Sequence, residues 1–199
     1  MTHQVLYLTG APASGKSTLA TALKAQGLAS WDYGAELLKR VAAARGRTYA
    51  ELRGDSAAMI TAEDVAKTDG DLVGWVAEER QRRHVVIDTH AVTREPFGFR
   101  VTPFSTERIV SLAPTALLCL YLDPEVARHR IASKPEGRLG VSTFEAGLHA
   151  GMQASVVVAY SIAVGVPAYM VDASGSPESL VKWVSEKFLS KTPRSTPGT

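Results

Sequence analysis

Short apolar runs alternate with segments of helical spacing along most of the chain. Five runs have the length and apolar content of buried strands, and they cover residues 5–9, 29–33, 85–88, 117–122 and 168–172. Helical segments separate these runs, so the strands are predicted to run parallel. Because a parallel sheet is buried on both faces, the pattern predicts a three-layer α/β sandwich: a five-stranded parallel sheet with helices on both faces.

Local signals indicate where several of the helices begin. A helix is predicted over residues 16–26, directly after a glycine-rich loop. Thr61 and Asp64 have the spacing of a capping box, which predicts a helix from there to Arg83. A last helix is predicted over residues 178–189, because a proline just before it suits a first helical turn.

Residues 146–171 contain no Asp, Glu, Lys or Arg, and a stretch of that length must be weighed as a membrane span. His149 and Gln153 lie within it, and Gly165 and Pro167 lie near its end. This pattern favours a buried helix that breaks at the glycine and proline and leads into a strand. We therefore expect no membrane partner.

The composition is that of an ordinary globular protein. A length of 199 residues, with 45% hydrophobic and 21% charged residues, favours a single domain over residues 1–189. Residues 190–199 have no apolar side chain except proline and are predicted to form a flexible tail. A net charge of only +2 argues against a nucleic-acid partner. The N-terminus lacks signal-peptide features and Cys119 is the single cysteine, so we expect a cytoplasmic protein.

A glycine-rich loop lies between the first predicted strand and the first predicted helix. Its sequence, Gly10-Ala-Pro-Ala-Ser-Gly-Lys-Ser17, matches the P-loop pattern G-x-x-x-x-G-K-[ST] in the context that the motif requires. The glycines let successive backbone N–H groups converge on phosphate oxygens at a helix N-terminus. Lys16 adds a positive charge toward the β- and γ-phosphates, and the Ser17 hydroxyl can ligate Mg²⁺. The predicted ATP ligands are Gly10, Ala11, Pro12, Ala13, Ser14, Gly15, Lys16, Ser17 and Thr18.

A carboxylate, Asp88, ends the third predicted strand. The carboxyl ends of parallel strands meet at one edge of a sheet, where ligands bind in open α/β folds. We therefore expect Asp88 near the P-loop, where it would hold Mg²⁺ with Ser17, directly or through water. The alternative is an aspartate that only caps the end of a strand.

Four segments together resemble the archaeal-type adenylate kinases, which are nucleoside monophosphate kinases. They are the P-loop, the stretch Asp32-Tyr-Gly34, the run Ile87-Asp-Thr-His-Ala-Val-Thr-Arg94 and the segment Leu122-Asp-Pro124. The likeness spans most of residues 4–185. It implies a sheet of strand order 2-3-1-4-5, an acceptor-binding helical flap within residues 33–83 and a short lid at residues 128–140. It also implies a reaction in which ATP and AMP, with Mg²⁺, become two ADP, and often a homotrimer.

The resemblance also implies roles for particular side chains. Arg53 and Arg94 would hold the phosphate of the acceptor, and Tyr33 and Gly34 would contact the acceptor beside them. The catalytic residues would be Lys16, Arg94, Arg128 and Arg138, the last two in the lid. These residue types suit the chemistry, because planar guanidinium groups match phosphate oxygens bidentately and neutralise the charge that phosphoryl transfer brings together.

The chain departs from the family at two places. Ala35 stands where the family has an aspartate, and the uncharged stretch Met152-Gln-Ala154 stands where it has an arginine. Three functions are therefore weighed. The first is a nucleoside monophosphate kinase acting on AMP, and the second is an ATP-dependent kinase of another small molecule. The third is an ATP-binding regulatory protein with little turnover.

Overall fold

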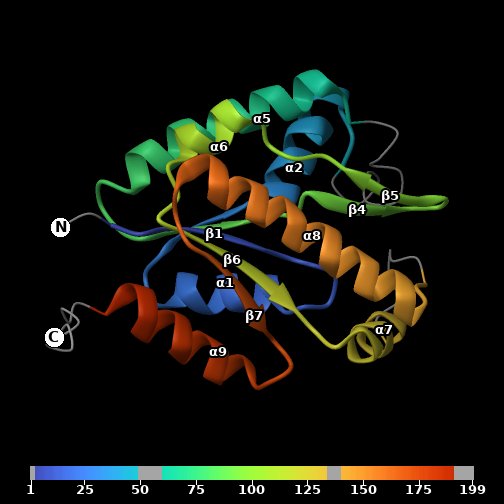
Figure 1. Ribbon diagram of the computed structural model, residues 1–199. Coiled ribbons are helices and arrows are strands. Elements are labelled where there is room, and N and C mark those ends of the chain that lie inside the picture. The colour runs from blue at the N-terminus through green and yellow to red at the C-terminus, as the bar shows by residue number, and fades with distance from the viewer. Residues whose placement is uncertain (1–2, 49–59, 134–139, 191–199) are drawn as a thin grey trace, which may run out of the picture.

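The computed structural model describes residues 3–48, 60–133 and 140–190, and Figure 1 shows how their helices and strands are arranged. In chain order the elements are β1 (Val5–Gly10), α1 (Lys16–Ala25), β2 (Ala29–Asp32), α2 (Tyr33–Arg45), α5 (Ala62–Glu79), β3 (Val85–Asp88), β4 (Val92–Glu95), β5 (Gly98–Val101), α6 (Thr106–Leu112), β6 (Ala116–Tyr121), α7 (Pro124–Ala132), α8 (Thr143–Val164), β7 (Ala168–Asp172), α9 (Pro177–Val184) and the π-helical turn η1 (Ser185–Leu189).

Five strands form one parallel sheet in the order β2-β3-β1-β6-β7. Counted among these strands alone, the order is 2-3-1-4-5, which confirms the predicted topology. β4 and β5 do not belong to this sheet, because they form a separate antiparallel hairpin. The pattern of apolar runs does not predict this hairpin, since its strands are only four residues long and carry polar side chains such as Thr93 and Arg100.

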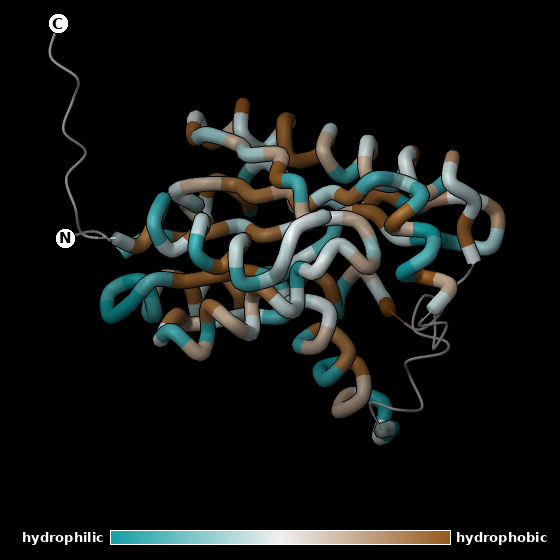
Figure 2. The backbone as a smooth tube through the Cα atoms, turned by 90° about the horizontal axis from the view of Figure 1, so that it is seen from below, coloured by the Kyte–Doolittle hydropathy of each residue, from teal (hydrophilic) through white to brown (hydrophobic). Residues whose placement is uncertain are grey.

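Alternate residues of the central strand β1 supply the two halves of the core. Leu6 and Leu8 pack toward α1 and α9, whereas Val5 and Tyr7 pack toward α5, α6 and α8. All four side chains are at most 1% exposed, and burying a leucine contributes roughly 1.5–3 kcal/mol. Figure 1 shows these two helical layers on opposite faces of the sheet, and Figure 2 shows the hydrophobic residues concentrated along the strands between them. The predicted three-layer sandwich is therefore confirmed.

The predicted capping box at the start of α5 is present. The Asp64 N–H donates to the Thr61 hydroxyl at 3.2 Å, and the Thr61 N–H donates to the Asp64 carboxylate at 2.9 Å. The Thr61 hydroxyl also donates to this carboxylate, at 2.8 Å. The two bonds that Thr61 donates, with that of Arg45, lower the pKa of Asp64 to about 2. The helix ends at Glu79, so the prediction that it continues to Arg83 was wrong by one turn.

The uncharged segment forms α8, which ends at Val164 with Gly165 as its left-handed cap (φ 69°). By length and composition this helix could cross a membrane. In the fold it lies along the sheet (Figure 1), and the side chains that it buries there include Gln153, Val157 and Tyr160. The large apolar side chains that it leaves exposed are Phe144, Leu148, Val158 and Ile162. The predicted helix with a glycine break is confirmed, and its burial is limited to one face.

The last helix begins at Pro177, as expected from the suitability of proline in a first turn. The α-helical part ends at Val184, and a π-helical turn continues it to Leu189. The predicted tail at residues 190–199 lies outside the described residues except for Ser190.

Candidate functional site

The P-loop joins the end of β1 to the start of α1 at the carboxyl edge of the sheet. Gly10 is required there for two reasons: its φ is 153°, and a Cβ would lie 2.4 Å from the carbonyl oxygen of Leu120. Gly15 and Ala13 have left-handed backbone angles, with φ of 87° and 64°. Successive turns of this kind aim backbone N–H groups into one concave loop, which is suited to an anion.

A cavity of about 510 Å³ opens above the loop. Every residue from Pro12 to Thr18 lines it, whereas Gly10 and Ala11 are buried and are not in its described lining. The Ser14 hydroxyl is buried and has no hydrogen-bond partner among the described residues. A buried hydroxyl without a partner is costly, and a phosphate oxygen would satisfy it. The residues of the loop therefore fit a nucleotide phosphate.

The same cavity extends toward α7 and the loop after β7. Its remaining lining residues are Leu19, Arg130, Ser133, Ala173, Gly175, Ser176, Pro177 and Leu180. Arg130 brings a guanidinium to the wall of the cavity that Lys16 also lines, so two cations border the space expected for the phosphates. The apolar residues of the same wall offer contacts that an uncharged part of a nucleotide would need.

Asp88 lies next to the P-loop, as predicted from its place at the end of a strand. It pairs in register with Leu8 of β1 and with Asp32 of β2, and the Ser17 hydroxyl donates to its carboxylate at 3.1 Å. The side chain is 6% exposed, and this burial raises its pKa, as does the nearby Asp32 charge; Lys16 and the Ser17 bond lower it. A carboxylate beside a hydroxyl at a phosphate site is a donor set suited to Mg²⁺, whose charge would stabilise the ionised form.

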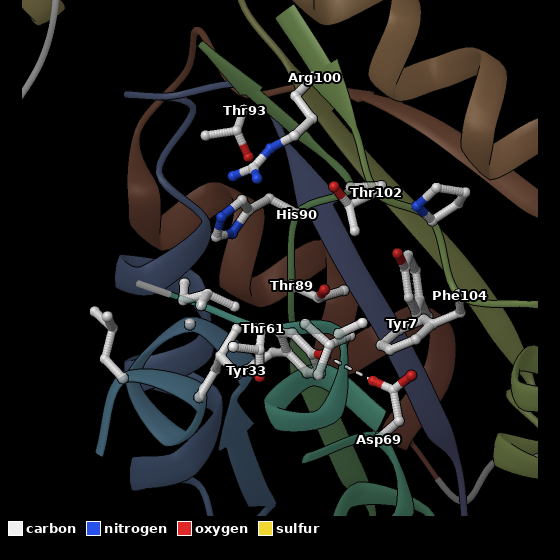
Figure 3. A pocket seen from close by; sticks show the side chains of 18 of the residues that line it. Tyr7, Tyr33, Thr61, Asp69, Thr89, His90, Thr93, Arg100, Thr102 and Phe104 are labelled. Atoms are coloured by element: carbon white, nitrogen blue, oxygen red, sulfur yellow. Dashed lines mark hydrogen bonds between the residues drawn. The ribbon is translucent and has the colours of Figure 1, made fainter. Parts of the chain in front are cut away.

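A second cavity, of about 350 Å³, is bordered by α2, α5 and the β4–β5 hairpin, and its wall includes Thr89, the residue after Asp88. Its lining residues are Tyr7, Tyr33, Gly34, Leu37, Leu38, Ile60, Thr61, Ala62, Val65, Asp69, Thr89, His90, Ala91, Thr93, Arg100, Thr102, Pro103, Phe104 and Tyr160. The two predicted acceptor contacts, Tyr33 and Gly34, are thus both in its wall. Figure 3 shows Arg100, Thr93 and His90 at one end and Tyr33, Asp69 and Phe104 at the other.

The aromatic end of the second cavity is held rigid by hydrogen bonds. The Tyr33 hydroxyl donates to Asp69 at 2.7 Å, and the Phe104 N–H donates to the Tyr160 hydroxyl at 2.5 Å. Arg108 stands 3.8 Å from the other carboxylate oxygen of Asp69. Burial raises the pKa of Asp69 and, together with the bond to Asp69, that of Tyr33. At this end the Phe104 and Tyr160 rings are stacked, with 28° between their planes, and Tyr33 meets Phe104 edge to face. The end therefore offers aromatic surface beside the Asp69 carboxylate.

The opposite end of the cavity carries His90. Its side chain reaches solvent at the cleft, and desolvation by the surrounding wall, with the nearby charge of Lys16, lowers its pKa to about 4. The imidazole is therefore neutral at physiological pH. It also lies 3.4 Å from the position that a Cβ on Gly34 would occupy, so a larger residue there would crowd it.

Two predicted arginines lie away from the cavities. Arg94 is absent from the described lining of the second cavity, and its guanidinium pairs instead with Glu145 of α8 at 2.6 Å. Arg128 pairs with Glu125 one turn earlier on α7, also at 2.6 Å, and is absent from the described lining of the first cavity. Arg53 and Arg138 lie outside the described residues. The proposed roles of all four arginines stay predictions.

The two charged residues in the described lining of the second cavity, Asp69 and Arg100, were not predicted from the sequence. Asp69 lies in the middle of α5, where an aspartate resembles any solvated helix position. Arg100 had a usable signal: the sequence Glu95-Pro-Phe-Gly98 contains turn residues between two short segments, which is typical of a hairpin. Because successive side chains of a strand point to opposite faces, a hairpin with this turn would place Arg94 and Arg100 on opposite faces.

Two solved structures of kinases are similar to this chain. A protein from Chloroflexus aurantiacus J-10-fl, described as a "putative kinase", matches with a TM-score of 0.54 and 17% identity, over 93% of this chain and 95% of that one, and it shows the same fold. A sugar kinase from Janibacter sp. HTCC2649 matches with a TM-score of 0.48 and 18% identity, over 92% and 93% of the two chains. No curated protein matched the sequence.

The sequence also matches a family model, described as an AAA domain, over residues 9–143. That range begins at the end of β1, contains the whole P-loop and Asp88, and reaches the first residue of α8. It covers more than half of the 199 residues. The chain therefore belongs to the AAA domain family, and within it has a P-loop kinase-like fold.

Proposed function

We propose that the protein is an ATP-dependent phosphotransferase that transfers the γ-phosphate of ATP to AMP. The observation that carries the proposal is a pair of cavities on the two sides of Asp88: Ser17, which donates to Asp88, lines the first cavity, and Thr89, the next residue in the chain, lines the second. A single phosphate site would need only the P-loop. Two cavities linked through Asp88 in this way suit a donor and an acceptor held for direct transfer.

The second cavity favours a flat ring with an anionic end over a small sugar. Tyr33, Phe104 and Tyr160 offer aromatic surface at one end, and Arg100 offers a cation at the other. A base would lie against the aromatic surface, and a phosphate would lie at the cationic end. This polarity agrees with the resemblance to adenylate kinases, and it supports AMP as the acceptor.

The placement of the carboxylates also favours a phosphate acceptor. A hydroxyl acceptor needs a base within hydrogen-bond reach, whereas a phosphate oxygen is already ionised near neutral pH because its second pKa is about 6. Among the described lining residues Asp69 is the one carboxylate, and it is bonded to Tyr33 at the aromatic end. Glu36 pairs with Lys39 outside the cavity, and Asp88 is bonded to Ser17. Glu95 pairs with Arg100, with 3.1 Å between its carboxylate oxygen and the guanidinium. Each of these described carboxylates is engaged by another group of the protein, which favours an acceptor that needs no base.

Lys16, Ser17 and the P-loop amides would bind the phosphates of ATP, and Ser17 with Asp88 would hold Mg²⁺. When bound, the metal neutralises charge on the phosphates being transferred. The chain's own residues would orient the two phosphates in line and exclude water between them. Arg130, from α7, would add a second cation at the donor site. The predicted lid arginine Arg138 and the predicted acceptor arginine Arg53 remain part of the proposal.

An acceptor panel tests this proposal. Purified protein is given ATP and Mg²⁺ with each nucleoside monophosphate, with adenosine and with a set of sugars, and ADP formation is measured by a coupled assay. We expect turnover with AMP, weaker turnover with other monophosphates and none with adenosine or sugars. Turnover on a sugar hydroxyl would replace this function with that of a small-molecule kinase, and ATP binding without any turnover would favour a regulatory protein.

Neutralising Glu36 is expected to leave AMP phosphorylation almost unchanged. Glu36→Gln removes only an exposed ion pair with Lys39, which contributes little, so kcat should stay within about twofold of the original value. The measurement is kcat and KM for AMP, with the Lys39→Gln variant as the matched control that breaks the same pair. A large loss of kcat in Glu36→Gln alone, with AMP binding preserved, would identify a general base and contradict the assignment of a phosphate acceptor.

A further inference from the structure

Two arginines lie on opposite faces of the β4–β5 hairpin. Across the hairpin, Thr93 pairs with Arg100 and Arg94 pairs with Phe99. Successive side chains of a strand point to opposite faces, so these two cross-strand pairs face in opposite directions. The first pair lines the second cavity, and the second pair faces α8. The hairpin thus presents only one of its two arginines to the acceptor.

Arg94 is held in place by the protein itself. Its guanidinium donates to Glu145 at 2.6 Å and to the Gly98 carbonyl at 3.2 Å, and it lies 5.4 Å from the centre of the Phe99 ring. Glu145 is also the capping-box residue that accepts from the Ser142 N–H at the start of α8. The charge of Arg94 is therefore neutralised in a part-buried contact that ties the hairpin to a helix end.

A second contact fixes the same face of the hairpin. His149 of α8 is 4% exposed, and its Nε2 donates to the Val92 carbonyl at 3.0 Å. The imidazole also meets the Phe99 ring edge to face, with centroids 5.0 Å apart. Burial is the main cause that lowers the pKa of His149, so the ring is neutral here and adds no competing charge. These contacts orient the hairpin from its α8 side.

The guanidinium of Arg100 can meet a ligand while it keeps its own partner. Its side chain is 47% exposed, and its Nε lies 3.1 Å from a carboxylate oxygen of Glu95 that is itself buried. The other guanidinium nitrogens can donate to a phosphate without leaving that oxygen unpaired. Figure 3 shows the guanidinium directed into the cavity beside Thr93 and His90. A guanidinium, a threonine hydroxyl and a neutral imidazole together form a set of donors suited to phosphate oxygens.

We propose that Arg100 is the specificity-determining residue that binds the phosphate of the acceptor, and that Arg94 is a positioning residue. Arg94 acts through the hairpin: its contact with Glu145 holds β5 so that Arg100 faces the cavity. This inference rests on the proposed function, since it assumes an acceptor with a phosphate. Arg100, which lines the cavity, thereby takes the phosphate contact that the family resemblance implies for Arg94, and the prediction for Arg53 is unchanged.

The test compares Arg100→Gln with Arg94→Gln, and uses Arg83→Gln as a surface control that breaks an exposed pair with Glu79. Rates are measured with AMP and ATP, and adenosine is used as a competitive inhibitor. Arg100→Gln should raise KM for AMP roughly 10- to 100-fold, the cost of losing one charge-assisted contact, and leave KM for ATP and the adenosine inhibition constant unchanged.

Arg94→Gln should behave differently from Arg100→Gln. It should lower kcat and speed hydrogen exchange of the β4–β5 amides, and Arg94→Lys should restore part of both because it keeps the charge opposite Glu145. Glu145→Gln should likewise lower kcat and speed this hydrogen exchange, because it removes the charge that pairs with Arg94. Glutamine can still complete the capping box, so the start of α8 should stay intact. The double variant Arg94→Gln/Glu145→Gln should then be no worse than either single variant.

The outcomes separate this inference from the function on which it rests. Turnover of AMP by the unmodified protein, with KM for AMP unchanged in Arg100→Gln, would overturn the inference alone. A raised KM for AMP in Arg94→Gln, with normal hydrogen exchange, would return the phosphate contact to Arg94. If the unmodified protein phosphorylates no monophosphate, the proposed function and this inference both fail.

Discussion

Lys16→Ala is expected to lower kcat by at least roughly 10²–10³-fold while the protein stays folded. Lys16 is the first residue of α1 and lines the cavity above the P-loop, where its ammonium group would meet the β- and γ-phosphates. Charge that develops on the transferred phosphate would then lose its nearest fixed cation. The side chain is only half-buried, so removing it leaves the apolar core intact.

The control for this variant is Lys24→Ala, in the last turn of the same helix. Lys24 is exposed and far from the P-loop along α1, so its loss changes the charge of the protein equally without touching the phosphates. ADP formation and thermal unfolding are measured for both variants. Near-normal activity in a folded Lys16→Ala protein would contradict the assignment of the P-loop as the donor site.

The sheet could be predicted from sequence because each of its strands is a continuous apolar run. Both faces of a parallel strand are covered, so residues such as Leu6 and Tyr7, which face opposite layers, must both be apolar. The β4–β5 hairpin obeys a different rule. It lies outside the sheet, its strands are only four residues long, and its polar side chains serve a cavity on one face and α8 on the other. An apolar-run criterion does not detect such an element.

The two halves of the site differed in how far sequence could predict them. The donor half is a contiguous loop, and the P-loop motif identifies its phosphate-binding residues directly. The position of Asp88 beside this loop could be predicted because the carboxyl ends of parallel strands meet at one edge of the sheet. The acceptor half is assembled from α2, α5, the hairpin and α8, and its residues are far apart in the chain. Whether Arg94 or Arg100 faces that cavity depends on the phase of one strand, which the resemblance to adenylate kinases does not determine.

In the same way, the helical phase of α7 determines which of its arginines, Arg128 or Arg130, lines the cavity above the P-loop. Arg128 lies three residues after Glu125 on α7, and the two form an exposed ion pair on one side of the helix. Arg130, two residues further on, lines the cavity above the P-loop instead. A count of arginines near the predicted lid cannot distinguish them, because the choice depends on how α7 packs against α8.

Asp88→Asn is expected to lower kcat roughly 10- to 100-fold and to weaken the dependence of the rate on Mg²⁺ concentration. Asp88 accepts from the Ser17 hydroxyl, and the two oxygens are the donor set assigned to the metal. Asparagine keeps the size and can still accept that hydrogen bond, but it carries no charge to hold a cation. The measurement is the rate as a function of Mg²⁺ concentration at saturating ATP and AMP. A rate and a Mg²⁺ dependence equal to those of the unmodified protein would exclude Asp88 from the metal site.

The same substitution is expected to raise the stability of the protein measured without nucleotide and Mg²⁺. Burial raises the pKa of Asp88 above its ordinary 3.8, so the folded protein holds the proton to a higher pH than the unfolded chain does. The free energy of unfolding therefore falls as the pH rises from the pKa of the unfolded chain through the higher pKa of the folded protein. The loss persists at neutral pH. The substituted asparagine stays uncharged at every pH, so thermal unfolding of Asp88→Asn should occur at a higher temperature than that of the unmodified protein at pH 7. The difference should vanish below about pH 3.8, where Asp88 is protonated in both states. A variant that is less stable at pH 7 would show that the ionised carboxylate stabilises this edge of the sheet even without a metal.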